Sequence, residues 1–385
     1  MLRRALIALV CAMACLLAIG LWQRDAITRL MAVQTLFAPD QIVANFSNMD
    51  ALFEHVDLSV SGTPTPLPAT ATGPLPEDLD VWTDRRSVTG MVVLRDGARV
   101  FETYRLGTNA NDPRISWSLA KSYLSALFGI LRAEGYFPDL DAPVTGFAPE
   151  LTGSAYDGAS LRHVLQMSTG VAFDEDYLDF WSDINKMGRV LALGGSMDRF
   201  ALGLTERQAP PGTRWQYVSI DTHVMGMVIR GATGQSLPDL MTDKLLQPMG
   251  TYGAPFFLTD GHGAAFALGG LNLTTRDYAR LGEMFRNDGR FQGKQIVPAD
   301  WVRESTRASA DTPAGAKGYG YQWWTPADAR AGEFMAQGVY GQYIYVDRQS
   351  ATVVAINAAD TNFRARGAAD DALDMMRRIA WKDSQ

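Results

Sequence analysis

A serine and a lysine stand three residues apart in Ser118-Leu-Ala-Lys121, where an irregular stretch gives way to a long apolar run. Residues three apart on a helix share one face, so the Lys121 amine can reach the Ser118 hydroxyl. Backbone N–H groups of the first helical turn are free and can stabilise an oxyanion near such a serine. The same spacing also fits a helix-capping serine beside an unrelated lysine. The pair alone leaves a nucleophile and a cap both open.

Two further segments carry candidate site residues. A turn-rich stretch at Pro210–Thr213 leads to Tyr217 and Ser219, just before a helical pattern. A tyrosine so placed can act as a base if nearby cations favour its phenolate, and a core tyrosine is the alternative. Later, Ala336–Gln342 has the sequence AQGVYGQ between two expected strands. Its glycines allow a ligand or another chain segment to approach the backbone closely.

Other chemical signatures are missing from the sequence. It has no G-x-S-x-G, H-E-x-x-H, Walker or G-x-G-x-x-G motif, and its four histidines are dispersed without metal-ligand spacing. Its two cysteines, Cys11 and Cys15, lie in the apolar N-terminal run, which excludes a thiol nucleophile from the globular part. The net charge is 35 − 42 = −7, the wrong sign for a nucleic-acid partner. We expect neither a metal nor an organic cofactor.

The elements that must position these residues form a sheet with a helical insertion. Ser87–Gly107 contains two β-rich runs around Asp96-Gly97, which predicts a hairpin. The fold class predicted is α/β, an antiparallel sheet flanked by helices whose two ends in sequence enclose a mostly helical subdomain. The remaining predicted elements are helices at Ser118–Glu134, Ser160–Met167, Ile220–Ala232, Leu237–Leu246, Thr275–Asn287, Pro298–Ser305 and Ala368–Trp381, and strands at Tyr319–Trp324, Glu333–Gln337, Gln342–Val346 and Ala351–Asn357.

The 385 residues, 47% hydrophobic and 20% charged, are typical of a compact globular protein. Residues 1–24 start with two arginines followed by an uncharged run, which predicts a cleaved export signal or a retained membrane anchor. Residues 25–79 are expected to form a leader, with a helix over Asp40–Phe53 and then a Pro/Thr-rich connector. Residues 80–385 are expected to form the main domain, with the helical subdomain at about 135–265.

Taken together, Ser-x-x-Lys, Tyr-x-Ser and the glycine-containing third motif resemble the penicillin-recognising serine hydrolases. The resemblance covers roughly residues 80–380 and is closest to the class C β-lactamase-related branch, including β-lactamase-like esterases and aminohexanoate-oligomer hydrolases. Further support comes from SLRHVLQMSTGV at Ser160–Val171 and from YGYQWWT at Tyr319–Thr325. The resemblance implies a β-lactamase/transpeptidase-like fold.

It also implies roles for residues of this chain. Ser118 matches the acylated nucleophile, Lys121 the group that accepts or shuttles its proton, and Tyr217 the base and later acid for the leaving group. Ser219 stands where many members have Asn. The oxyanion hole would combine the N–H groups of Ser118 and Val339.

The departure from the family pattern is Ala336, which stands where many members have Lys or His. No cation is then available there to bind a substrate carboxylate. Substrate contacts are expected from Tyr177, Ser219, Ala336 and Gly338.

The prediction is an exported serine hydrolase that cleaves a small ester or amide and resides in the periplasm or on the inner membrane facing it. The alternative is a membrane-anchored relative without turnover that binds a cell-wall or peptide ligand. The sequence leaves the natural substrate and the oligomeric state open.

Overall fold

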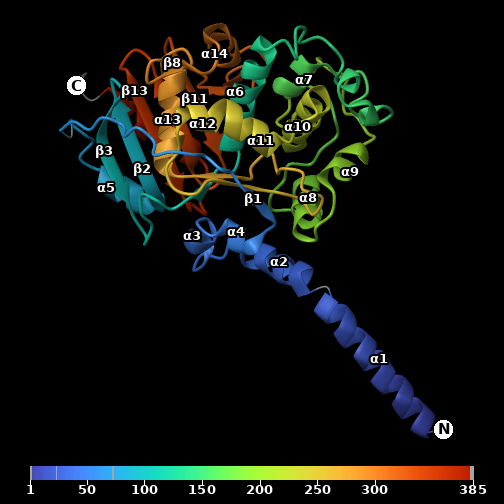
Figure 1. Cartoon of the computed structure of the whole chain (residues 1–385). Coiled ribbons are helices and arrows are strands. Elements are labelled where there is room, and N and C mark those ends of the chain that lie inside the picture. Colours follow the sequence, from blue (N-terminus) through green and yellow to red (C-terminus); the bar gives the residue numbers. More distant parts are fainter. Residues whose placement is uncertain (1, 23, 72, 382–385) are drawn as a thin grey trace.

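The structure is a computed structural model that describes residues 2–22, 24–71 and 73–381. Figure 1 shows a sheet covered by helices on both faces, a mostly helical lobe beside it, and the N-terminal helix α1 (Leu2–Trp22) pointing away from the body. The helical subdomain at about 135–265 stays a prediction, and the lobe in the structure contains helices from this part of the chain. Its helices are α7 (Leu161–Leu165), α8 (Asp183–Ala192), α9 (Met197–Leu202), α10 (Ser219–Thr233), α11 (Leu237–Met241), α12 (Gln247–Met249), two 3₁₀ turns at Val144–Gly146 and Pro149–Leu151, and a π-helical turn at Thr242–Leu246.

The main sheet has seven antiparallel strands in the order β3-β2-β13-β12-β11-β10-β9. The first and last parts of the main domain therefore pair with each other, as the sequence predicts for a sheet that encloses an insertion. Strand bounds are β2 (Val88–Arg95), β3 (Ala98–Tyr104), β9 (Gly318–Tyr319), β10 (Trp324–Thr325), β11 (Glu333–Gly338), β12 (Gln342–Asp347) and β13 (Thr352–Ala358).

Both faces of this sheet are buried, and alternate residues of each central strand enter different cores. On β12, Ile344 packs with helices α6 and α13, whereas Tyr343 packs with helices α5 and α15. The two cores explain why the central strands read as nearly continuous apolar runs. The covering helices are α5 (Leu79–Arg85), α6 (Leu119–Ala133), α13 (Thr275–Arg286), α14 (Ala299–Ser305) and α15 (Ala368–Ala380).

The hairpin predicted at Asp96-Gly97 joins β2 to β3. Both turn residues have positive φ, 50° at Asp96 and 75° at Gly97, as a two-residue hairpin turn requires. A second hairpin replaces the single strand expected over Tyr319–Trp324. Gln322 has a φ of 62° there, so the chain reverses and Tyr319 of β9 pairs with Trp324 of β10.

A smaller sheet of four short strands was not predicted. Its order is β1-β5-β6-β4, with bounds His55–Asp57, Phe256–Leu258, Leu271–Leu273 and Arg114–Ile115. Strands this short carry little periodicity, and their pairing joins segments far apart in sequence. The sheet ties the leader to the main body, because β1 pairs with β5. Its edge strand β4 runs directly toward Ser118. Outside these two sheets, β7 (Arg290–Phe291) pairs with β8 (Lys294–Gln295) as a separate hairpin.

The leader differs from the single helix expected over Asp40–Phe53. It forms α2 (Arg24–Thr35), α3 (Ile42–Asn45) and α4 (Met49–Leu52), because Asn48 leaves helical geometry and its side-chain Nδ2 donates to the Ala44 carbonyl at 2.7 Å. The break allows both Phe46 and Met49 to be buried in the main core. Of the expected export segment, Met1 and Gln23 lie outside the described residues. Among the residues that are described, no helix is both long and apolar enough to span a membrane.

Candidate active site

Ser118 lies where β4 turns into α6. Trp117 immediately before it has a left-handed backbone conformation, with φ of 43°, and Ser118 is the N-cap residue of the helix. The Ser118 side chain makes no capping hydrogen bond. Its hydroxyl is therefore available for another role, although the sequence alone left a simple helix cap open.

Lys121 lies one helical turn further on, and its Nζ is 3.3 Å from the Ser118 Oγ. The same nitrogen is 2.9 Å from the Leu268 carbonyl oxygen and 3.4 Å from the Ser219 Oγ. Lys121 is 2% exposed, and this burial lowers the pKa of its amine to about 7, against the opposing effect of Glu175 and Asp221.

A neutral amine fits these three neighbours. It has two N–H groups and one free electron pair, and the Leu268 carbonyl and the Ser219 hydroxyl oxygen can accept the two N–H groups. The free electron pair then faces the Ser118 hydroxyl, which can donate its proton to it. The geometry suits removal of the Ser118 proton by Lys121.

Tyr217 lies just before α10, and its ring centroid is 5.4 Å from the Lys121 Nζ. The ring stacks on Trp324 of β10 with centroids 5.4 Å apart. Burial raises the pKa of the Tyr217 phenol, the Glu175 carboxylate raises it further, and hydrogen bonding to Ser118 and Ser219 opposes this only in part. The cationic surroundings that a phenolate base requires are therefore not met, and the resting Tyr217 is a neutral phenol.

The third motif brings backbone N–H groups to Ser118. A Cβ placed on Gly338 would lie 3.2 Å from the Ser118 nitrogen, so β11 passes against the start of α6 at this point. Within the described part of the chain, neither the Ser118 N–H nor the Val339 N–H donates to another backbone group. These two N–H groups are available for an oxyanion.

The turn after Gly338 is held by aromatic packing. Tyr340 stacks on Phe37 of the leader with centroids 4.7 Å apart, and Phe46 lies against both Tyr340 and Trp117 at 5.5 and 5.4 Å. Because Trp117 precedes Ser118 and Tyr340 follows Val339, this cluster fixes the two sides of the expected oxyanion hole relative to each other.

Ala336 does not line the site as expected. Its side chain is fully buried, because strand alternation places it between β11 and α6, opposite Ile344 of β12. It contributes no surface to a substrate and no charge. Arg214, the nearest basic residue in sequence to Tyr217, is exposed and donates to Gln208 at 3.2 Å. Next to Ala336 on β11, the Gln337 side chain accepts a hydrogen bond from the Lys317 Nζ at 2.9 Å.

Glu175 is the site residue that the sequence analysis overlooked. Its carboxylate accepts hydrogen bonds from the Tyr177 hydroxyl at 2.8 Å and from the Ser219 backbone N–H at 3.0 Å, and it also accepts from the Ser219 hydroxyl. The structure thus brings Tyr177 and Ser219, both predicted substrate-contacting residues, onto one carboxylate. The acidic loop around Tyr177 was the available signal, but nothing in it distinguishes Glu175 from its neighbours Asp174 and Asp176.

Asp221 was missed as well. It lies one half-turn into α10, is fully buried, and accepts from the Tyr156 hydroxyl at 2.8 Å and from the Thr169 hydroxyl. Burial raises the pKa of this carboxyl to about 8, despite these hydrogen bonds. Asp221 is therefore mostly protonated at neutral pH.

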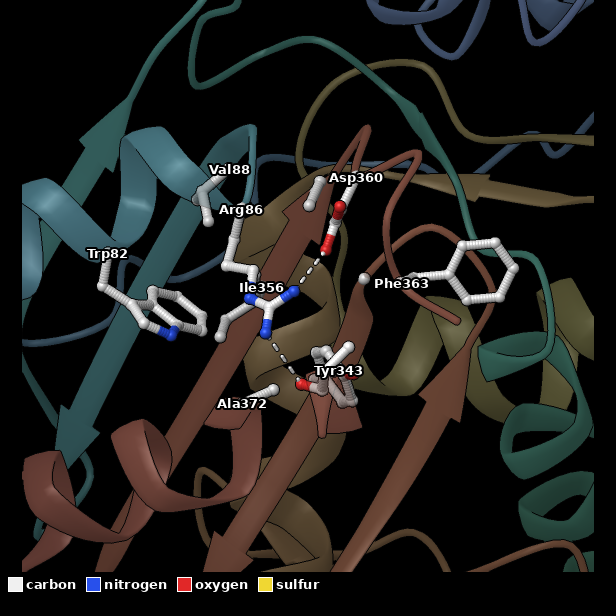
Figure 2. A pocket seen from close by; sticks show the side chains of 11 residues that line it. Trp82, Arg86, Val88, Tyr343, Ile356, Asp360, Phe363 and Ala372 are labelled. Atoms are coloured by element: carbon white, nitrogen blue, oxygen red, sulfur yellow. Dashed lines mark hydrogen bonds and ion pairs between the residues drawn. The ribbon is translucent and has the colours of Figure 1, made fainter. Parts of the chain in front are cut away.

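A small, partly open pocket of about 10 Å³ lies on the opposite face of the sheet, and none of the candidate site residues lines it. Figure 2 shows Arg86 reaching Asp360 across it, an ion pair of 3.3 Å. The Asp360 backbone N–H donates to the Tyr340 carbonyl, so this pair supports the turn that carries Val339 from behind. The volume suits a single water-sized molecule. Among the described side chains, no group of three or more His, Cys, Asp or Glu residues could hold a metal ion.

Comparison with known proteins identifies relatives of this arrangement. The Beta-lactamase family model matches residues 80–375. The chain is 30% identical to the 6-aminohexanoate-dimer hydrolase of Paenarthrobacter ureafaciens over 292 residues, which cover 72% of this chain and 74% of that protein. It is 26% identical to Esterase EstB of Burkholderia gladioli, with 54% of this chain and 68% of that protein covered.

Solved structures agree in fold. A proposed 6-aminohexanoate-dimer hydrolase from Bacillus anthracis superimposes with a TM-score of 0.78 at 22% identity, covering 89% of this chain and 96% of that one. The octameric penicillin-binding protein homologue from Pyrococcus abyssi gives a TM-score of 0.57 at 18% identity, covering 78% of this chain and 76% of that one. At these identities the likeness shows the fold, and it confirms the predicted β-lactamase/transpeptidase-like architecture.

Proposed function

The chain belongs to the Beta-lactamase family and is a serine hydrolase, and from this premise we propose that it cleaves an ester or amide through an acyl-enzyme on Ser118. The observation that carries the proposal is the buried Lys121 amine 3.3 Å from the Ser118 hydroxyl, with a pKa lowered to about 7. A neutral amine in that position can activate the serine near neutral pH.

The reaction would proceed in two balanced stages. Lys121 takes the Ser118 proton while the Ser118 oxygen attacks the substrate carbonyl, and the Ser118 and Val339 N–H groups bind the oxyanion. The neutral Tyr217 phenol donates its proton to the departing amine or alcohol and is reprotonated from the Lys121 ammonium. Water then attacks the acyl-enzyme carbonyl with its proton passing to Lys121, and Ser118 recovers that proton as the acid is released.

The charges around the site favour uncharged acyl groups. Ala336 supplies no cation to bind a substrate carboxylate, and the Glu175 carboxylate adds a negative charge near Lys121. A missing charge-assisted hydrogen bond costs about 1.5–3 kcal/mol, which is about ten- to a hundredfold in affinity. We therefore propose short-chain esters and small uncharged amides, including linear oligoamides, in preference to carboxylate-bearing β-lactams. The names of the curated relatives, an aminohexanoate-dimer hydrolase and an esterase, support this direction.

We also propose that the protein is exported and resides in the periplasm or tethered to the membrane that faces it. Arg3 and Arg4 precede an uncharged run, and the apolar side chains of Leu6, Leu17 and Trp22 on α1 are 63%, 66% and 82% exposed. Exposed apolar side chains of this kind suit a signal sequence or a membrane contact. Full-length protein found free in the cytosol after cell fractionation would contradict the proposal.

The deciding experiment is labelling of the purified protein with a fluorophosphonate probe, followed by peptide mapping. We expect a covalent adduct on Ser118, and none in Ser118→Ala. The matched control is Ser122→Ala, since Ser122 lies on the same helix but its hydroxyl donates to the Gln322 carbonyl. Absence of labelling in the parent protein would favour the alternative of a binding module without turnover.

A further inference from the structure

The Glu175 carboxylate connects a loop of the helical lobe to the start of α10. Its Oε2 accepts the Ser219 backbone N–H at 3.0 Å, and its Oε1 accepts the Tyr177 hydroxyl at 2.8 Å and the Ser219 hydroxyl. Ser219 is the first residue of α10, so the carboxylate also lies at the positive end of that helix. A single side chain thus holds both the backbone and the hydroxyl of Ser219.

The direction of the Ser219 hydroxyl follows from this contact. A hydroxyl has one proton, and Ser219 donates it to Glu175, because an ionised carboxylate can only accept. The Ser219 oxygen must then act as the acceptor toward the Lys121 Nζ, 3.4 Å away. With a second N–H directed at the Leu268 carbonyl, the free electron pair of Lys121 is directed at Ser118.

We propose that Glu175 is a positioning residue of this site: it fixes the Ser219 hydroxyl as an acceptor, and its negative charge favours the protonated form of the buried Lys121. The inference rests on the proposed function, since it concerns the activation of Ser118. Glu175 acts through Ser219 and Lys121, so it is not itself a group that contacts the reacting atoms.

Two carboxyl groups act electrostatically on Lys121, and Glu175 has the larger effect. The other carboxyl that acts on Lys121 is Asp221, which is mostly protonated at neutral pH because burial raises its pKa to about 8. On the outer side of the loop, Arg364 pairs with Asp176 at 3.5 Å and lies 5.9 Å from the Tyr177 ring centroid. Three further titratable neighbours, Tyr177, Tyr217 and Tyr319, have pKa values raised by burial and by Glu175 and stay neutral.

The direction in which Glu175 shifts the pKa of Lys121 follows from its negative charge. Glu175 favours the protonated form of Lys121, and removing its charge must lower the pKa of Lys121 further. The pH below which Ser118 loses its reactivity would then move downward. A purely structural role for Glu175 would reduce the rate or the stability without moving that pH.

The test measures the second-order rate constant for fluorophosphonate labelling of Ser118 between about pH 5 and 9. We expect Glu175→Gln to shift the acidic midpoint downward by about one pH unit, as loss of an opposite charge at close range does. Glu175→Ala, which removes the same charge and also releases Ser219, should label at least about tenfold more slowly above about pH 8, where Lys121 is neutral in both proteins, since one 1.4 kcal/mol contact is worth that factor. Asp176→Asn is the matched control, a neighbouring carboxylate that does not touch Ser219, and should leave the midpoint unchanged.

Ser219→Ala provides an independent variant, because it removes the bridge but keeps the Glu175 charge. We expect slower labelling with the midpoint close to that of the parent protein. An unmoved midpoint in a folded Glu175→Gln protein would overturn the inference, as would undiminished labelling of Ser219→Ala. Both outcomes differ from failure of the proposed function, which would appear as a parent protein that does not label on Ser118 at all.

Discussion

Lys121→Met should abolish activity and at the same time stabilise the protein near neutral pH. The Lys121 amine has an ordinary pKa of 10.5 and a folded-state pKa of about 7, so the unfolded chain binds more protons between these values. Linkage then makes the folded state less stable as the pH falls through this window. The cost of holding this lysine neutral amounts to about 4 kcal/mol at pH 7 and about 2 kcal/mol at pH 9.

Methionine has a similar length and carries no charge, so it removes this cost. It also removes the hydrogen bonds to the Leu268 carbonyl and the Ser219 hydroxyl, which costs about 1–3 kcal/mol at either pH. We therefore expect the free energy of unfolding to rise by about 1–3 kcal/mol at pH 7 and to change little at pH 9.

The assay is urea unfolding at both pH values, with reversibility checked. Lys186→Met is the control, because Lys186 is half exposed and forms only a surface ion pair with Asp183. For this control the stability difference should be the same at pH 7 and pH 9. A Lys121→Met protein whose stability relative to the parent does not fall by about 2 kcal/mol between pH 7 and pH 9 would refute the assignment of Lys121 as a neutral buried amine.

Three further outcomes are expected. Ser118→Ala should lower turnover of ester substrates by several orders of magnitude, as removal of other nucleophiles does. Turnover like that of the parent would show that another residue is the nucleophile. The rate at which the fluorophosphonate probe labels the parent protein should fall about tenfold from pH 8 to pH 6, because it follows the neutral fraction of Lys121. Lys121→Arg should stay inactive at both pH values, because a guanidinium remains charged. Short-chain esters and linear oligoamides should be cleaved with a kcat/KM at least about tenfold above that of benzylpenicillin, because Ala336 supplies no cation for the penicillin carboxylate. Equal values would indicate that another cation binds the carboxylate. Lys317 would then be the first residue to mutate.

Local sequence determined the parts of the site that lie within one element. The i, i+3 spacing of Ser118 and Lys121 places both on one face of α6, and helical geometry alone then brings the amine within 3.3 Å of the hydroxyl. The Asp96-Gly97 turn likewise fixes the β2–β3 hairpin, because both residues tolerate positive φ. Such features depend on backbone preferences of a few consecutive residues, which the sequence displays directly.

Tertiary structure decided the chemistry of those residues. The shift in the Lys121 pKa comes from burial, and its hydrogen-bond partners Ser219 and Leu268 are 98 and 147 residues away in sequence. The choice of Glu175 among several acidic neighbours depends on where one loop meets the start of α10. The four-stranded sheet that directs β4 toward Ser118 is built from strands of two or three residues, too short to show a period. Electrostatic and packing effects act through space, so no pattern along the chain could specify them.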